Sequence, residues 1–282
     1  MPDWTAEARV DERLARKLVR TQFGLGESVS LLSEGWDYVT YLVDETWVFR
    51  FPRRAVVVPG TERELRVLPR LSLPVSIPTP VHVGRQTEEY PWPFYGARFI
   101  PGREAVGLSD EERVGLARPL ARALAALHRA TIDDLPFDPI GRADMRVRVP
   151  RTREALDAVG LHCDEILERA EALPPAQPAA VCHGDLHFRQ LLVERGELTG
   201  IIDWVDVCRS DPGVDLQLYW SFLPPAGRDA FLDEYGEVSE DSLLRARVLA
   251  LFLNAILARY GRAEGLQRVE AEAVASLDRA RS

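Results

Sequence analysis

The chain has 282 residues, of which 46% are hydrophobic and 28% charged, and its formal net charge is −9. This length and composition fit a folded protein with two lobes rather than one small module. The acidic balance argues against a nucleic-acid-binding protein, because phosphate backbones need a concentrated basic surface, and no apolar run approaches the length of a membrane span.

The first part of the chain is predicted to be rich in strands. Helical periodicity extends over residues 5–23, and an antiparallel meander follows, with turn residues between its strands. A short helix is expected at residues 61–71. The predicted strands are 29–32, 39–43, 47–51, 81–85 and 94–100.

The second part of the chain is predicted to be mainly helical. Ser109 and Glu112 have the spacing of a capping box, which starts a helix that reaches about residue 130. Further helices are expected at residues 151–173, 225–235, 242–260 and from about 265 to the end. The only strand candidates here are 190–193 and 198–202. This change of character places a lobe boundary near Gly102.

Residues 181–206 contain the pattern with the most chemical content. Asp185 lies in a polar loop together with His183 and His187, and Asp203 follows directly after an apolar run. Residues 190–202 read as a hairpin that brings Asp203 back toward the loop. Two acids in this arrangement are suited to hold Mg²⁺ and phosphate.

Two other interpretations of this loop compete with phosphoryl transfer. His183, Asp185 and His187 are competent zinc ligands, and an isolated Asp and His also commonly cap a turn. The remaining histidines show no ligand spacing, whereas Gln190 stands at the amide position of the kinase catalytic-loop pattern H-R-D-x-x-x-x-N. We therefore favour phosphoryl transfer, with Asp185 accepting the proton of a substrate hydroxyl.

HGDLHFRQLLV followed by IIDWVDVCRSDPGVDL resembles the aminoglycoside and macrolide phosphotransferase family over nearly the whole chain. The resemblance implies an α+β, protein-kinase-like, two-lobed fold. A small antiparallel-sheet lobe over residues 1–102 would hold the nucleotide, and a larger helical lobe over residues 103–282 would carry the catalytic loop and the acceptor site. The implied activity is transfer of the γ-phosphoryl group of ATP or GTP, with Mg²⁺, to a hydroxyl of a small molecule such as an antibiotic or a metabolite alcohol.

The same resemblance assigns roles within the helical lobe. Asp185 is the catalytic base, and His183 supports it as a structural residue of the catalytic loop. Asp203 is the metal ligand, and Gln190 stands where family members often carry an Asn that binds a second metal. Gln offers the same amide oxygen on a longer side chain. The alternative is a non-catalytic protein that binds a nucleotide.

Two further acids of the helical lobe, Asp211 and Asp215, are expected to brace the catalytic loop. The acceptor site should lie beside Asp185. Its candidate lining residues, each of which has an alternative role in the core or on the surface, are Asp206, Tyr219, Trp220, Glu234, Tyr235 and Glu237.

The resemblance also assigns nucleotide contacts in the first lobe. The turn that contains Ser33 and Gly35 would cover the phosphates. Arg50 would supply the cation that contacts them, in place of the usual lysine. Its expected partner is Glu64, with Glu62 as the alternative.

A hinge is expected between the lobes. Arg98 and Ile100 lie in the extended segment whose backbone would meet the base of the nucleotide. Arg53 and Arg54 are expected to face solvent. The odd number of cysteines and the absence of a signal-peptide pattern favour a cytoplasmic protein with reduced thiols, as a monomer or dimer.

Overall fold

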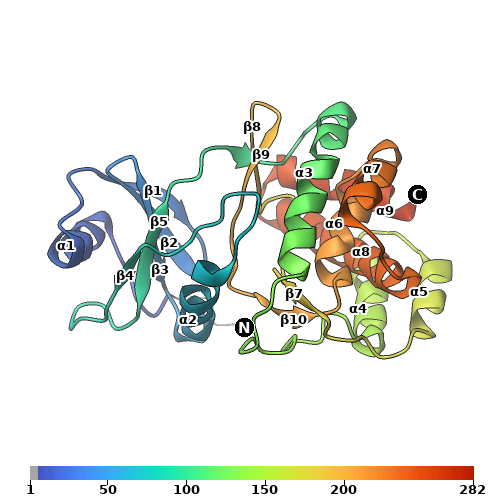
Figure 1. Ribbon diagram of the computed structural model, residues 1–282, viewed down its shortest axis with the longest axis horizontal. Helices are drawn as coiled ribbons and strands as arrows, with labels where there is room; N and C mark the ends of the chain where they lie inside the picture. Colours follow the sequence, from blue (N-terminus) through green and yellow to red (C-terminus); the bar gives the residue numbers. More distant parts are fainter. Residues whose placement is uncertain (1–5) are drawn as a thin grey trace. The chain divides into compact units, whose positions relative to one another are not determined.

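The computed structural model describes residues 6–282, which form two compact units (Figure 1). The described part of the chain up to Leu71 joins Ile77–Ile100 in the first unit, and Ser72–Ser76 joins Pro101–Ser282 in the second. The division after Ile100 lies close to the boundary expected at Gly102. Ser72–Ser76 belongs with the second unit because the Ser76 carbonyl accepts a hydrogen bond from Ile201 N at 3.0 Å.

The first unit contains a five-stranded antiparallel sheet in the order β1-β2-β3-β5-β4 (Figure 1). The expected meander is confirmed, with Thr40 opposite Arg50 between its second and third strands. Buried side chains alternate over residues 39–43 and 49–51 and form part of a largely aromatic core. The strands are β1 (Val29–Glu34), β2 (Tyr38–Val43), β3 (Trp47–Pro52), β4 (His82–Gly84) and β5 (Phe94–Arg98).

The helices of the first unit differ from the prediction at their ends. Helix α1 (Glu12–Phe23) begins later than expected, because the Asp11 carboxylate accepts a hydrogen bond from Leu14 N at 2.7 Å and caps it. Thr5, where this helix was expected to begin, lies outside the described residues. Helix α2 (Val58–Val67), by contrast, begins earlier than expected, and a short 3₁₀ turn, η2 (Leu68–Arg70), completes the predicted helical segment. A further 3₁₀ turn, η1 (Ala55–Val57), precedes α2.

The second unit is mainly helical, as expected, and this confirms the α+β class. Helix α3 starts with the predicted capping box, in which Ser109 and Glu112 bond to each other's backbone N–H. Its helices are α3 (Asp110–His128), α4 (Met145–Asp157), α5 (Asp164–Glu171), α6 (Gly213–Ser221), α7 (Pro225–Tyr235), α8 (Glu240–Ala263) and α9 (Gln267–Arg281). Its strands are β6 (Arg103–Glu104), β7 (Ala180–Cys182), β8 (Leu191–Glu194), β9 (Glu197–Ile201) and β10 (Cys208–Ser210).

The prediction was wrong at three places in this unit. The single helix expected over residues 151–173 is two helices, α4 and α5, and Gly160 in the link between them has a left-handed φ of +72°. Helix α6 was not predicted, because it is buried on nearly every side and shows no amphipathic period. Strands β6, β7 and β10 were also missed, since two or three residues are too few to show alternation.

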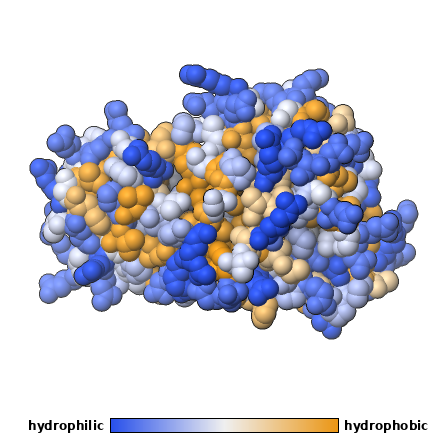
Figure 2. Space-filling view, in the orientation of Figure 1, coloured by the Kyte–Doolittle hydropathy of each residue, from blue (hydrophilic) through white to orange (hydrophobic). Residues whose placement is uncertain are grey.

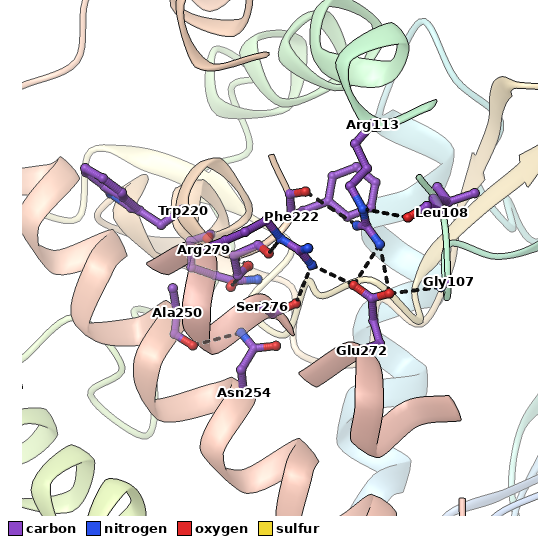
Figure 3. Close-up of polar contacts among 12 residues, drawn as sticks. Gly107, Leu108, Arg113, Trp220, Phe222, Ala250, Asn254, Glu272, Ser276 and Arg279 are labelled. Atoms are coloured by element: carbon purple, nitrogen blue, oxygen red, sulfur yellow. Dashed lines mark hydrogen bonds and ion pairs between the residues drawn. The ribbon is translucent and has the colours of Figure 1, made fainter. Parts of the chain in front are cut away.

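A buried ion network fastens α9 to the start of α3 (Figure 3). Glu272 lies on α9, and both its carboxylate oxygens are 2.8 Å from Arg113 Nη2. Arg279 Nη2 donates to the same carboxylate at 2.7 Å, and Gly107 N donates to it at 2.9 Å. Arg113 and Glu272 are 1% and 5% exposed. Breaking a buried pair of this kind leaves an uncompensated charge, so the network holds the C-terminal helix in place.

Hydrophilic side chains cover much of the visible face, with hydrophobic patches between them (Figure 2). Among residues 6–282, no helix combines the length and the apolar character that crossing a membrane requires.

Candidate functional site

The predicted catalytic loop, which follows β7, is anchored by a side chain of α6. Asp215, on the first turn of α6, accepts hydrogen bonds from His183 N at 2.7 Å and Gly184 N at 3.1 Å. His128 Nε2 lies 3.2 Å from the same carboxylate. Although burial raises the pKa of Asp215, these partners more than offset it and hold the pKa below its ordinary value. Asp215 is therefore a fixed negative charge that braces the loop, as predicted.

The other predicted brace, Asp211, contacts a different part of the fold. Its carboxylate accepts from Gly213 N at 2.8 Å and Ser242 Oγ at 3.2 Å, and it pairs with Arg245 at 3.5 Å. These contacts fix the start of α6 rather than the catalytic loop. The expectation for Asp211 was therefore wrong in its partner, because sequence proximity to Asp215 does not show which way a side chain points.

His183 joins the catalytic loop to the end of the β8–β9 hairpin. Its Nε2 lies 2.9 Å from the Ile202 carbonyl, so this nitrogen donates, and its Nδ1 accepts from Asp185 N at 3.3 Å. The ring lies 4.6 Å from the ring of Trp204. Burial lowers the pKa of His183 and keeps the imidazole neutral. Through these contacts His183 holds the backbone of Asp185 in place beside the end of the hairpin.

Asp203 follows β9 in an uncommon backbone conformation. Its φ is +68°, in the left-handed region that residues other than glycine rarely adopt. Trp204, fully buried, donates from Nε1 to the Ile201 carbonyl at 2.8 Å and helps to hold this turn. Backbone strain of this kind costs about 1 kcal/mol or more and persists where the surroundings impose it, often at functional sites.

The Asp185 carboxylate is surrounded by other acids. Burial raises its pKa, Asp206 and Asp203 raise it further, and the opposing charge of Arg142 does not cancel them, so that the pKa is about 7. A carboxylate with this pKa is suited to accept a proton near neutral pH. The same electrostatics show that Asp203 and Asp206 act on Asp185 although they follow it in a different loop.

This set of oxygen donors fits a magnesium ion. Mg²⁺ prefers carboxylate oxygens, and the mutual repulsion that raises the pKa of Asp185 is what a divalent cation relieves. Asp203 is the candidate ligand from the hairpin. Which residues hold the ion remains a prediction.

Gln190 is buried and its side chain closes the catalytic loop. Its Oε1 accepts a hydrogen bond from His187 N at 3.1 Å, while Gln190 N donates to the His187 carbonyl at 3.0 Å. The Gln190 carbonyl in turn accepts from Ile202 N at 3.0 Å. An amide oxygen has a second lone pair, so a role for Gln190 as a metal ligand remains a prediction.

The zinc interpretation does not agree with the contacts of this loop. Both ring nitrogens of His183 have hydrogen-bond partners, and His187 Nδ1 accepts from Arg189 N at 3.3 Å. A different cluster of possible ligand atoms, within 4.8 Å of one another, comprises His128, Cys182 and Asp215. Sequence spacing missed this cluster. Its His128 and Asp215 are already engaged with Tyr235 and with the loop backbone.

The first unit pairs the predicted nucleotide-binding cation with its expected partner. Arg50 on β3 donates from Nη1 to Glu64 Oε1 at 2.7 Å. Glu64, on α2, is fully buried, and the guanidinium of Arg50 lies 3.8 Å from the centre of the Tyr38 ring. Glu62 was the alternative partner. The pairing fixes the direction of the Arg50 side chain, and its contact with a nucleotide remains a prediction.

Ser33 and Gly35 lie where β1 turns into β2. Gly35 N donates to the Tyr38 carbonyl at 2.9 Å, which closes the turn, and the side chain of Arg53 donates to the Gly35 carbonyl. Arg53 also pairs with Glu34 at 2.7 Å.

The expectation that Arg53 and Arg54 face solvent was wrong. Their side chains are 16% and 15% exposed, because Arg53 pairs with Glu34 and Arg54 Nε donates to Asp37 at 2.8 Å. The two arginines thus fasten the turn between β1 and β2 to the end of β3. Sequence alone does not show which arginines a neighbouring loop recruits.

Arg98 and Ile100 end the first unit. Arg98 closes β5, and its guanidinium lies 5.2 Å from the centre of the Trp47 ring. Phe99 N donates to the Thr46 carbonyl at 2.8 Å. Ile100 is the last residue of the unit. Contact of this segment with a nucleotide base remains a prediction.

The candidate acceptor residues divide into three groups. Tyr219 and Tyr235 are buried against Phe231, and Trp220 donates from Nε1 to the Leu243 carbonyl at 2.9 Å, so these aromatics pack within the helical unit. Glu234 pairs with arginines of α3, and Glu237 is exposed. Only Asp206 among the six acts on the charge of Asp185 in the described residues.

Arg142 and Asp138 were missed by sequence reasoning. Arg142 lies 2.9 Å from Asp206 and 3.0 Å from Asp138, beside the catalytic loop. Both residues precede α4, in a segment without a recognisable motif. An arginine flanked by an acid four residues earlier is too common a pattern to have indicated them.

Comparisons with known proteins agree with this arrangement. A model of the phosphotransferase enzyme family matches residues 28–251. No curated protein matches the chain. A GDP complex of aminoglycoside 2'-phosphotransferase-IIIa is similar with a TM-score of 0.67 and 21% identity, over 96% of this chain and 99% of that chain.

Two other solved structures are similar at the same level. A streptomycin–ATP complex of APH(2")-IIa has a TM-score of 0.61 and 21% identity, over 93% of this chain and 96% of that one. Macrolide 2'-phosphotransferase MphH from Brachybacterium faecium has a TM-score of 0.63 and 20% identity, over 95% and 97%. At these identities the likeness shows the fold, which is the kinase-like fold expected from the sequence.

Proposed function

Because the chain belongs to the phosphotransferase enzyme family, we propose that it transfers the γ-phosphoryl group of ATP or GTP to a hydroxyl of a small molecule. The observation that carries the proposal is the convergence of Asp185 and Asp203 on adjoining loops that His183 joins. Phosphoryl transfer needs little covalent chemistry from a protein, so positioning and charge are the main requirements.

Asp185 is the proposed base of this reaction. It would accept the proton of the acceptor hydroxyl as the hydroxyl oxygen bonds to the γ-phosphorus and the bond from that phosphorus to the β,γ-bridging oxygen breaks, which releases the nucleoside diphosphate. Burial and the neighbouring acids Asp206 and Asp203 raise the pKa of Asp185 and so make it a better base. His183 keeps the Asp185 backbone N–H engaged, and Asp215 fixes the two residues before it. The loop is therefore held in place before an acceptor arrives, which lowers the entropy cost of alignment.

Two other groups are proposed to handle the phosphate charge. Arg50, oriented by Glu64, would contact the nucleotide phosphates with its forked guanidinium. When bound, Mg²⁺ would be held by Asp203, with Gln190 as a second candidate, and would neutralise charge on the phosphoryl oxygens. The turn at Ser33 and Gly35 would cover the phosphates.

The proposed acceptor is an antibiotic or a metabolite alcohol. The support for an antibiotic is that the similar structures are of aminoglycoside and macrolide phosphotransferases, one with streptomycin bound. A second candidate function is nucleotide binding without turnover. It is favoured by Gln190, whose Oε1 already accepts a hydrogen bond from His187 N.

Mixing the protein with ATP or GTP, Mg²⁺ and a panel of aminoglycosides, macrolides and amino or sugar alcohols tests the proposal. We expect a phosphorylated acceptor by mass spectrometry and none with Asp185→Asn. Failure to phosphorylate any acceptor, together with no nucleotide binding by calorimetry, would contradict both candidate functions. Nucleotide binding with no product, and a large gain of activity in Gln190→Asn, would select the non-catalytic alternative.

A further inference from the structure

Arg142 is a buried cation that the proposed chemistry does not use. It is only 8% exposed and lies in the segment between α3 and α4. Its Nη1 donates to Asp138 Oδ1 at 3.0 Å, and its Nη2 lies 2.9 Å from Asp206 Oδ1. One guanidinium thus bridges two carboxylates that are far apart in the sequence, which the planar fork of arginine allows.

The Asp138 side of this bridge is firmly held. Asp138 Oδ2 accepts a hydrogen bond from Ala143 N at 3.2 Å, so its two oxygens bind both the side chain of Arg142 and the backbone beside it. Asp138 N donates to the Arg209 carbonyl on β10 at 2.9 Å. Arg142 therefore extends from a segment that is itself fastened to the sheet.

The Asp206 side of the bridge reaches the catalytic loop. Gly184 has a φ of +94°, and a Cβ on it would lie 2.3 Å from the Asp206 carbonyl oxygen. The backbone of Asp206 therefore packs directly against the residue before Asp185. Electrostatics point the same way, since Asp206 raises the pKa of Asp185 and Arg142 lowers it.

We propose that Arg142 is a positioning residue for the catalytic loop: by holding Asp206 toward Asp138, it fixes the turn on which Gly184 rests and so the place of the Asp185 carboxylate. The proposal rests on the proposed function only in giving Asp185 the role of base. A displaced base lowers turnover without a matching loss of nucleotide affinity.

Hydrogen exchange tests this positioning without any turnover. Arg142→Gln removes the two-point bridge, and Arg146→Gln is the matched control. Arg146 lies on the first turn of α4, directly after this segment, is 79% exposed in its side chain and pairs locally with Asp144 at 2.8 Å. We expect the amides of residues 182–186 to exchange at least about fivefold faster in Arg142→Gln than in the wild type, with no change in Arg146→Gln. Unchanged exchange in α8 would show that the fold is intact.

Kinetics test the consequence for Asp185. We expect kcat to fall about tenfold or more in Arg142→Gln, with the nucleotide KM within about twofold of the wild type. Arg142→Lys should recover part of kcat, because an ammonium keeps the charge but not the fork. Asp206→Ala should give a similar loss, and the double variant should be no worse than the worse single one, since both act through one contact.

If Arg142→Gln showed the same amide exchange and the same kcat as Arg146→Gln, Arg142 would have no positioning role. If the losses of kcat multiplied in the double variant, Arg142 would not act through Asp206. A wild-type protein that transfers no phosphate would contradict the proposed function instead. The exchange comparison would still test Arg142 in that case.

Discussion

Replacing Asp185 with Asn should stabilise the fold while it removes turnover. Burial and the neighbouring acids Asp206 and Asp203 raise the pKa of Asp185 from an ordinary value of 3.8 to about 7. Because the folded-state pKa is the higher one, folding favours the protonated carboxyl. The contribution of Asp185 to stability is therefore most favourable below pH 3.8 and is lost as the pH rises to about 7.

The size of the effect follows from this difference in pKa. One pH unit corresponds to about 1.4 kcal/mol, so an ionised Asp185 costs the folded state about 4 kcal/mol at pH 8. Solvent reaches part of the side chain and reduces this cost, and we expect Asp185→Asn to raise the free energy of unfolding by about 2 kcal/mol. The gain should shrink by more than half at pH 5, where the folded wild type is already protonated.

Urea unfolding at pH 8 and pH 5 in EDTA measures this effect. Asp229→Asn, an exposed acid on α7, is the control and should change the free energy of unfolding by less than about 0.5 kcal/mol at either pH. A variant less stable than the wild type, or a gain that is the same at both pH values, would refute the electrostatic reasoning.

Three further changes test other parts of the structure. Asp203→Asn should keep the wild-type stability, because Asn tolerates a φ of +68°, whereas Asp203→Ala should lose about 1 kcal/mol in urea unfolding. Calorimetry should show weaker Mg²⁺–nucleotide binding in both variants. Arg50→Met should lower nucleotide affinity and should lower the free energy of unfolding by about 3 kcal/mol, because it leaves Glu64 buried without this cation. Arg50→Lys should retain much of both, and equal behaviour of the two variants would argue against the ion pair. Glu272→Ala should lower the free energy of unfolding by about 3–5 kcal/mol, because it leaves Arg113 and Arg279 uncompensated. The partner of Glu270, Arg262, is mostly exposed, so Glu270→Ala should lower it by less than about 1 kcal/mol. Similar losses in the two variants would contradict the importance of burial.

Long, regular elements could be predicted from the sequence because their signals are local. The alternation in β2 and β3 and the Ser109 capping box each lie within a few residues, and the structure confirms them. The two-residue strand β6 owes its conformation to pairing with β8, which no local pattern reveals. The late start of α1 depended on Asp11, a capping signal that competes with the helical period before it.

The candidate site divides in the same way. Asp185 and Asp203 stand in a compact motif, so the sequence placed them on one loop and on the hairpin after it. Arg142 could not be found, since α4, α5 and the hairpin separate it from its partner Asp206 in the sequence. The contact of Gly184 with the Asp206 backbone is likewise a product of tertiary packing.

The central claim is that Asp185 serves as the base for phosphoryl transfer to a small-molecule hydroxyl. The most direct measurement is ³¹P NMR of the products formed from ATP or GTP, Mg²⁺ and the acceptor panel, with the wild type and Asp185→Asn compared at equal nucleotide occupancy. We expect a new phosphate-ester signal with the wild type and none above background with the variant. An equal ester signal from both proteins would contradict the role of Asp185 as the base.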